Sequence, residues 1–150
     1  MKTSHMKNIQ RRKSERGVTL IEMLVVVTII GLIATLVAVN VFKQAEGAKR
    51  KLAHTDINTF INALNLYRLD TGTFPSTELG LQALRLKPEG VINWAGPYLQ
   101  KDVPLDQWNR PFQYKYPGEH GDEPDIVSLG ADGQPGGEGD NADIVSWNNK

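Results

Sequence analysis

The chain has 150 residues, with no cysteine and three histidines. This composition excludes disulfides, thiolate catalysis and cysteine-based zinc sites, and the length limits the chain to one modest domain. Lysine plus arginine and aspartate plus glutamate each number 17, so the total charge gives no indication of nucleic-acid binding. The charge is unevenly placed, because residues 1–17 carry six basic side chains against one acid and the rest of the chain sums to −5.

An apolar segment of 25 residues, 18–42, follows the basic cluster, and its only formally charged residue is Glu22. A helix of this length crosses a hydrocarbon core of about 30 Å. The segment is too long for an ordinary secretory signal, and no Ala-x-Ala site follows it. A buried helix of a soluble core is also disfavoured, because the remaining residues are too few to cover it. We therefore predict a transmembrane segment with the basic end in the cytoplasm.

Glu22 is unusual because a carboxylate inside an apolar span costs at least about 3 kcal/mol. In a stack of membrane helices, it can lie beside the positively charged α-amine of a neighbouring chain, so that assembly neutralises both charges. The alternative is that its side chain reaches the cytoplasmic interface, which is only one helical turn away.

Beyond the span, residues 43–67 become amphipathic, which predicts that the helix continues outward to about Asp70, where Gly72 provides a stop. Val39 keeps its amide hydrogen, so the helix should remain unbroken there. The apolar residues at helical spacing are Ala53, Ile57, Phe60, Ile61, Leu64 and Tyr67.

The last half of the chain is rich in turns and short strands. A short helix is expected to start at Pro75 and Ser76, and residues 87–110 read as a loop. Strand patterns occur at 112–116, 125–129 and 143–147. The predicted fold class is therefore α+β, with a long N-terminal helix, half transmembrane and half amphipathic, packed on a small antiparallel sheet.

The hexapeptide Gly17-Val18-Thr19-Leu20-Ile21-Glu22, after a basic leader, resembles the cleavage motif of type IV prepilins and type II secretion pseudopilins. The resemblance implies that a membrane prepilin peptidase cleaves between Gly17 and Val18 and methylates the new amino terminus of Val18. Glu22 is then the fifth mature residue, which is the acidic position of this family and implies a role in assembly.

Further short motifs are similar to those of the major pseudopilins of type II secretion. They are Phe74-Pro75, Gly80-Leu81-Gln82-Ala83-Leu84, Gly96-Pro97-Tyr98-Leu99, Asp106-Gln107-Trp108 and Ser128-Leu129-Gly130-Ala131-Asp132-Gly133. This resemblance implies three parts: a cleaved leader at 1–17, the transmembrane half of the helix at 18–42, and a periplasmic domain at 43–150.

The resemblance also implies a function. The mature chain would be a single-pass protein of the bacterial inner membrane that forms a homopolymer, a periplasmic fibre that drives export of folded proteins across the outer membrane. Its expected partners are its own copies, minor pseudopilins, the prepilin peptidase and the inner-membrane secretion platform. A type IV pilus subunit and a monomeric, membrane-anchored periplasmic binding domain are the alternatives.

The segment 129–143 contains four carboxylates and five glycines. From these residues alone, both a solvated acidic turn and a calcium site remain possible, because calcium takes carboxylate and carbonyl oxygens in flexible geometry. The resemblance implies calcium as the cofactor. The implied ligands are the side chains of Asp132, Asp140 and Asp143, with Glu138 as the alternative to Asp140, and the carbonyl oxygens of Leu129 and Gln134.

No enzyme is predicted. The sequence contains no Gly-x-Ser-x-Gly elbow, no His-Glu-x-x-His and no glycine-rich phosphate loop. His120 lies near Asp122 and Glu123, but these residues form no recognisable catalytic motif.

Overall fold

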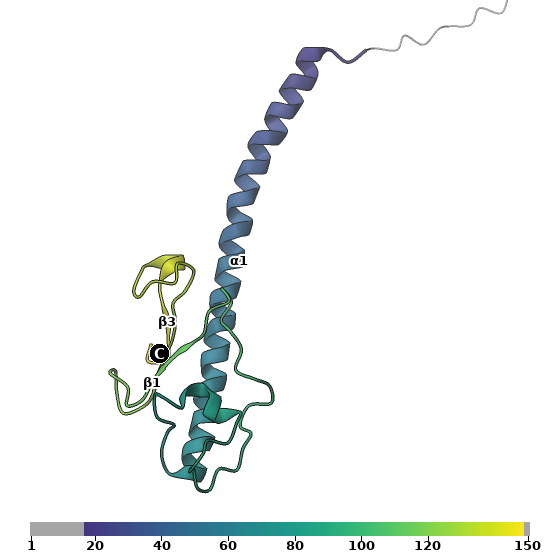
Figure 1. Cartoon of the computed structure of the whole chain (residues 1–150). Coiled ribbons are helices and arrows are strands. Elements are labelled where there is room, and N and C mark those ends of the chain that lie inside the picture. Colours follow the sequence, from purple (N-terminus) through teal and green to yellow (C-terminus); the bar gives the residue numbers. More distant parts are fainter. Residues whose placement is uncertain (1–16, 149–150) are drawn as a thin grey trace, which may run out of the picture. The chain divides into compact units, whose positions relative to one another are not determined.

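The structure, a computed structural model, describes residues 17–148 apart from the side chains of Val39, Asn40 and Phe42. The predicted leader lies outside the described residues except for Gly17. Residue contacts separate a first unit that ends at Asn40 from a second unit that begins at Val41. One helix, α1 (Leu20–Thr71), contributes residues to both units (Figure 1).

The first half of α1 has the surface expected of a membrane span. The described side chains from Val18 to Ala38 are all exposed, and Leu20 is 85% exposed. The hydroxyls of Thr28 and Thr35 donate hydrogen bonds of 2.7 Å to carbonyl oxygens of the preceding turn. Such internal bonding satisfies polar groups where water is absent. Within the described residues, α1 is the helix long and apolar enough to cross a membrane.

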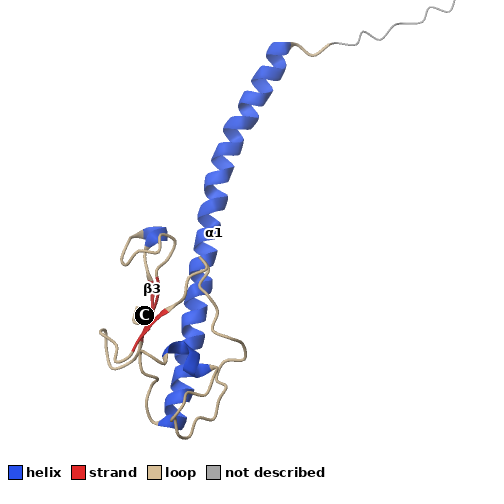
Figure 2. Ribbon diagram, viewed as in Figure 1, coloured by secondary structure: helices blue, strands red, loops and turns tan. Residues whose placement is uncertain are grey.

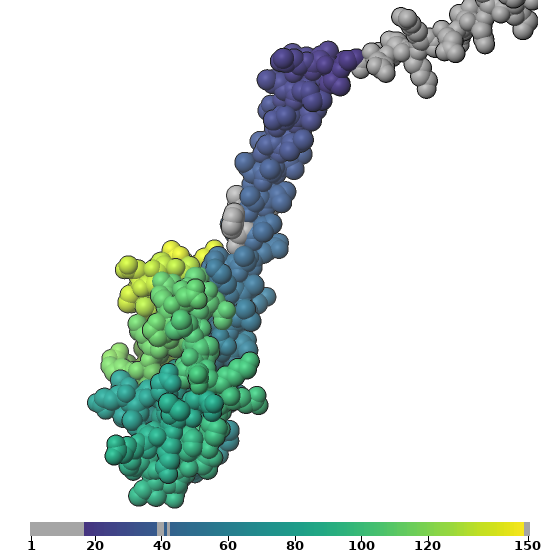
Figure 3. Space-filling view, turned by 45° about the vertical axis from the view of Figure 1, so that its right-hand side comes forward, coloured from purple at the N-terminus to yellow at the C-terminus, as the bar shows by residue number. Residues whose placement is uncertain are grey.

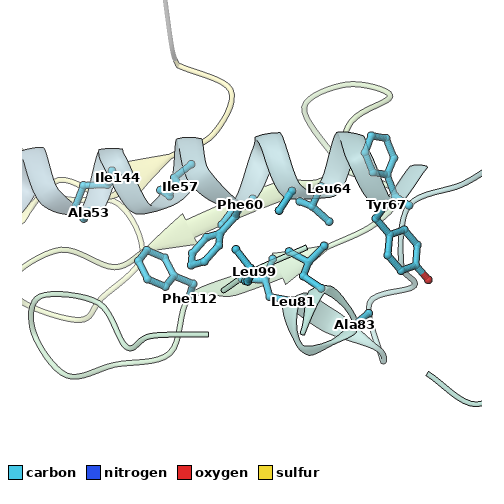
Figure 4. Close-up of a cluster of buried hydrophobic side chains, with 14 residues drawn as sticks. Ala53, Ile57, Phe60, Leu64, Tyr67, Leu81, Ala83, Leu99, Phe112 and Ile144 are labelled. Atoms are coloured by element: carbon cyan, nitrogen blue, oxygen red, sulfur yellow. The ribbon is translucent and has the colours of Figure 1, made fainter. Parts of the chain in front are cut away.

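The second half of α1 forms one wall of a small domain. Its buried face matches the predicted apolar stripe, except that Ile61 is only partly buried. Figure 4 shows these side chains against residues of the later segments, with the rings of Phe60 and Phe112 in edge contact at 5.1 Å. The fully buried members of the core are Ala53, Ile57, Phe60, Leu64, Tyr67, Leu84, Ile126 and Ile144.

Three short strands and two short 3₁₀ helices follow α1, and much of the domain is loop (Figure 2). The strands form one antiparallel sheet in the order β1-β2-β3, which confirms the predicted sheet. In chain order the elements are η1 (Gly80–Leu84), β1 (Gln113–Lys115), β2 (Asp125–Ser128), η2 (Gly139–Asn141) and β3 (Ile144–Val145).

The ends of the elements follow from local chemistry. Gly72 adopts φ +88° directly after α1, as predicted for its stop. The short helix expected at Pro75 begins later, at Gly80, because residues 76–80 form a separate turn that ends in a left-handed glycine with φ +59°. Strand β1 is shorter than the predicted 112–116, and the amide of Tyr116 donates to the hydroxyl of Thr77 at 3.0 Å instead of to the sheet.

Candidate functional site

The N-terminus of α1 is closed by two reciprocal hydrogen bonds. The backbone amide of Glu22 donates to the hydroxyl of Thr19 at 3.2 Å, and the backbone amide of Thr19 donates to Oε2 of Glu22 at 3.5 Å. This is a capping box, in which Thr19 is the N-cap and Glu22 the third helical residue. Glu22 therefore has partners within its own chain.

The capping box was missed by the sequence analysis, although its Thr-x-x-Glu pattern is visible there. It places the Glu22 carboxylate in the first turn of α1, where the helix dipole favours negative charge. Val18, the predicted mature N-terminus, directly precedes the N-cap and is 62% exposed. An α-amine at Val18 would thus begin next to the helix end that carries Glu22.

The acidic loop, residues 129–143, connects β2 to β3 and contains η2. Asp143 holds it closed, because its backbone amide donates to the carbonyl oxygen of Gly136 at 3.1 Å and its Oδ2 accepts from the Gly136 amide at 2.8 Å. The other carboxylate oxygen, Oδ1, is buried and has no hydrogen-bond partner. A buried carboxylate oxygen without a donor is costly, and a bound cation would remove that cost.

The other predicted calcium ligands are spread along the loop. Oδ1 of Asp132 accepts from the Gln134 amide at 3.0 Å, and the carbonyl oxygen of Leu129 accepts from the Gly133 amide at 3.2 Å. Asp140 lies exposed in η2. Within residues 17–148, no three acidic, histidine or cysteine side chains are grouped closely enough to hold a metal ion. A cation here would therefore depend on carbonyl oxygens as well as on Asp143.

Two glycines allow separate parts of the acidic loop to approach each other closely. A Cβ added at Gly130 would lie 2.8 Å from the Ala142 carbonyl oxygen, and one at Gly137 would lie 2.5 Å from the Asn141 carbonyl oxygen. Both glycines also have positive φ, at +60° and +80°. The loop is thus folded back on itself rather than extended.

Two arginines hold the ends of the acidic loop. Nη2 of Arg110 donates to the carbonyl oxygens of Gly130 and Ala131 at its entry. Nη1 of Arg50, on α1, donates to the carbonyl oxygens of Asp140 and Ala142 at its exit. Figure 3 shows the yellow C-terminal segment directly against the blue part of α1. Sequence analysis missed both arginines, since nothing in the local pattern links them to a loop far along the chain.

Arg110 is positioned by a turn built on the buried Asp106. Oδ1 of Asp106 accepts from the amides of Trp108 and Arg110 at 3.0 and 2.8 Å, and Oδ2 accepts from the Ser128 hydroxyl at 2.7 Å. The guanidinium then lies against Gly133, where it occupies the space a Cβ would need. Asp106 thereby joins the turn, strand β2 and the acidic loop.

The same turn is joined to α1 by two acids. Nε1 of Trp108 donates to Glu46 and Nε2 of Gln107 donates to Asp56, each at 3.0 Å. Hydrogen bonds from Lys49 and then Trp108 hold the pKa of Glu46 below its usual value. Burial raises the pKa of Asp56, and the hydrogen bond from Gln107 opposes that change. The turn, and with it the acidic loop, is therefore fixed to α1 by hydrogen bonds to both acids.

His120, which belongs to no catalytic motif in the sequence, makes contacts that stabilise the fold. Its Nδ1 lies 2.8 Å from Oδ2 of Asp125, and its ring stacks on Trp147 with centroids 3.6 Å apart. A cavity of about 150 Å³ lies beside it. The nearby Ser146 hydroxyl is used by the sheet, since it accepts from the Ile126 amide at 3.0 Å. These contacts attach the β1–β2 loop to the C-terminal segment.

Two protein-family models match the chain. The model described as type II secretion system (T2SS), protein G, matches residues 40–147. The model described as the prokaryotic N-terminal methylation motif matches residues 12–38, a range that contains Gly17, Val18 and Glu22.

Curated relatives and a solved structure agree with these matches. The type II secretion system core protein G of Pseudomonas aeruginosa is 43% identical over 142 residues, which cover 93% of this chain and 99% of the relative. The core protein G of Vibrio cholerae is 41% identical over 143 residues, covering 93% and 97%. The crystal structure of the major pseudopilin from the type 2 secretion system of enterohaemorrhagic Escherichia coli is 34% identical, with a TM-score of 0.60, covering 69% of this chain and 87% of that one.

Proposed function

The chain belongs to the type II secretion system protein G family, and from this premise we propose that its copies polymerise into a periplasmic fibre that drives export of folded proteins across the outer membrane. Members of this family are structural subunits, so the expectation that the chain is not an enzyme is confirmed. The type IV pilus subunit and the monomeric binding domain are set aside in favour of this family. The proposed partners are further copies, minor pseudopilins and an inner-membrane secretion platform.

The chain is membrane-anchored through the first half of α1, as the methylation motif and the apolar helix indicate. We propose that the membrane is the bacterial inner membrane and that the domain from Lys43 onward lies in the periplasm. The basic residues before Gly17 support this orientation, because positively charged flanks remain in the cytoplasm. We further propose that a prepilin peptidase cleaves between Gly17 and Val18 and methylates Val18.

The observation that best supports assembly is the position of Glu22 in the first turn of α1. In one chain its carboxylate bonds to the Thr19 amide at 3.5 Å, near the limit for a hydrogen bond. The charged α-amine of Val18 on a neighbouring chain is a stronger partner, because pairing in the apolar phase offsets the desolvation of both charges. We propose that this exchange of partners joins each new subunit to the fibre.

The experiment is to extract the protein from membranes, measure its intact mass, and crosslink it before extraction. The expected mass is that of a chain starting at methylated Val18, and the crosslinked sample should contain a ladder of multimers. A Gly17→Leu variant, which blocks the proposed cleavage, should remain at precursor mass and yield no ladder. A monomer at full precursor mass in the unmodified chain would contradict the proposal.

We also propose that calcium binds the acidic loop. Supporting this is Oδ1 of Asp143, which is buried without a partner in a loop rich in carbonyl and carboxylate oxygens. The residues proposed to hold the ion are Asp132, Asp140 and Asp143 through side chains, and Leu129 and Gln134 through carbonyl oxygens. The ion would supply positive charge to Oδ1 of Asp143, the buried oxygen that otherwise lacks a donor.

The calcium proposal is tested by thermal unfolding of the detergent-solubilised full chain in millimolar calcium and in chelator. Calcium at 100 times its dissociation constant stabilises the fold by about 2.7 kcal/mol, so Tm should rise by several degrees. Asp143→Asn keeps an acceptor for the Gly136 amide but removes the charge, and should abolish the difference. Asp122→Asn, in the exposed β1–β2 loop, is the matched control. Equal Tm values in the two buffers would support a solvated acidic turn instead.

A further inference from the structure

The contact of Arg50 with the acidic loop differs from a surface ion pair. Its Nη1 donates to two backbone carbonyl oxygens, those of Asp140 and Ala142. Carbonyl oxygens belong to the backbone, so these bonds depend on the path of the chain rather than on the charge of a mobile side chain. Arg50 itself is partly buried on α1.

Ala142 lies between Asp143 and the two groups that its carbonyl oxygen approaches, Gly130 and Arg50. It directly precedes Asp143, whose Oδ1 is the buried oxygen without a partner. Its carbonyl oxygen also faces Gly130, at a distance that excludes any larger residue there. Gly130 in turn is held by Arg110, which Asp106 positions. The entry of the loop is held in this way, and Arg50 contacts the carbonyl of the residue next to Asp143 at the exit.

We infer that Arg50 couples the state of the acidic loop to the part of α1 that follows the membrane span. This inference rests on the proposed calcium site and adds a positioning residue to it. Coupling is reciprocal, so that the loop with its cation bound slows opening of α1 around Arg50, and an ordered α1 strengthens cation binding by the same factor. Both partners lie within the unit that begins at Val41.

The proposed role of Arg50 depends on its hydrogen bonds to the loop backbone and not only on its positive charge. A neighbouring lysine allows the two contributions to be separated. Lys51, the next residue, is exposed, and its removal changes the charge of the helix by the same amount as removal of Arg50. Arg50→Gln and Lys51→Gln therefore form a matched pair. Glutamine has a helix propensity similar to those of arginine and lysine, so neither substitution weakens α1 by itself.

The experiment measures amide hydrogen exchange by mass spectrometry on the full chain in detergent micelles, with calcium or with chelator. In the unmodified chain and in Lys51→Gln, calcium should slow exchange across residues 46–56 several-fold while leaving 60–71 nearly unchanged. In Arg50→Gln, exchange across 46–56 should be the same in both buffers. Calcium titration calorimetry should give a dissociation constant about fivefold larger for Arg50→Gln than for Lys51→Gln, the lower end of typical couplings.

The outcomes separate the two proposals. If the unmodified chain binds no calcium in the titration, the calcium site and the coupling built on it both fail. If calcium binds and protects 129–143 but exchange across 46–56 does not change, the coupling through Arg50 alone is overturned. This second comparison needs no variant, so it holds even if Arg50→Gln does not fold. Equal protection in Arg50→Gln and Lys51→Gln would also overturn it.

Discussion

At the scale of single residues, buried polar groups decide how the loops of this domain are placed. Asp106 is only 3% exposed and accepts three hydrogen bonds, two from backbone amides and one from Ser128. Hydrogen bonds to a charged group are worth about 1.5–3 kcal/mol, and a buried group left unpaired costs a comparable amount. The turn that carries Trp108 and Arg110 therefore depends on one carboxylate.

Ser128→Ala tests this network, because it removes the hydroxyl that donates to Oδ2 of Asp106 and leaves that oxygen without a partner. We expect the free energy of unfolding to fall by about 2 kcal/mol, measured by denaturant titration of the detergent-solubilised chain. Thr59→Ala is the control, since its exposed hydroxyl bonds within α1, and it should change stability by less than about 0.5 kcal/mol. Equal effects of the two substitutions would count against the network.

Glu46 makes part of the stability dependent on pH. Its pKa in the folded chain lies below the ordinary value of 4.5, because it accepts hydrogen bonds from Lys49, which has the larger effect, and from Trp108. The folded state thus binds the proton less readily than the unfolded state, and the stabilisation is fully present above pH 4.5 and lost as pH falls through the folded pKa. We expect the Tm difference between the unmodified chain and Glu46→Gln to be constant from pH 7 to 5 and to shrink toward pH 3. A constant difference over the whole range would contradict this.

At the scale of elements, α1 shows two kinds of helix in one continuous segment. Its first half exposes apolar side chains on every face, whereas its second half buries one stripe and leaves polar residues outside. The helix also continues through Val39, as expected for a residue that retains its amide hydrogen. The change in composition along α1 therefore coincides with the change in the exposure of its side chains.

The continuity of α1 is tested by amide exchange across residues 36–43 in detergent. These amides should exchange as slowly as those of the neighbouring turns, because each donates within the helix. Val39→Pro removes one donor and places its ring against the preceding turn, so it should raise exchange in 35–39. Fast exchange across this window in the unmodified chain would show that the helix opens there without a proline.

The elements that were predicted correctly are those that depend on the pattern of neighbouring residues in the sequence. The stripe from Ala53 to Tyr67, the stop at Gly72 and the three strands follow from periodicity and turn residues. The roles of Arg50 and Arg110 depend on contacts with residues far along the chain, so no local pattern reveals them. The predicted ligand set of the acidic loop came from family resemblance and remains to be tested.

At the scale of the whole molecule, the proposed assembly into a fibre depends on Glu22. Glu22→Ala should leave cleavage and insertion largely intact, because neither needs the carboxylate, but it should abolish efficient fibre formation by removing the partner of the incoming amine. Crosslinking yield in membranes measures this. Thr28→Val is the control, since its hydroxyl is bonded within the same helix at Leu24. A normal multimer yield from Glu22→Ala would contradict the role of Glu22.

The close approach of Arg110 to Gly133 constrains how this sequence can evolve. The guanidinium occupies the space that a Cβ at 133 would need, and Gly133 itself adopts φ +70°. While arginine stands at 110, a larger residue at 133 displaces the guanidinium from the carbonyl oxygens of Gly130 and Ala131. A shorter residue at 110 removes that obstacle, but the positive φ still disfavours a side chain at 133. Glycine at 133 is therefore favoured for two separate reasons, the conformation of its own backbone and the arginine beside it.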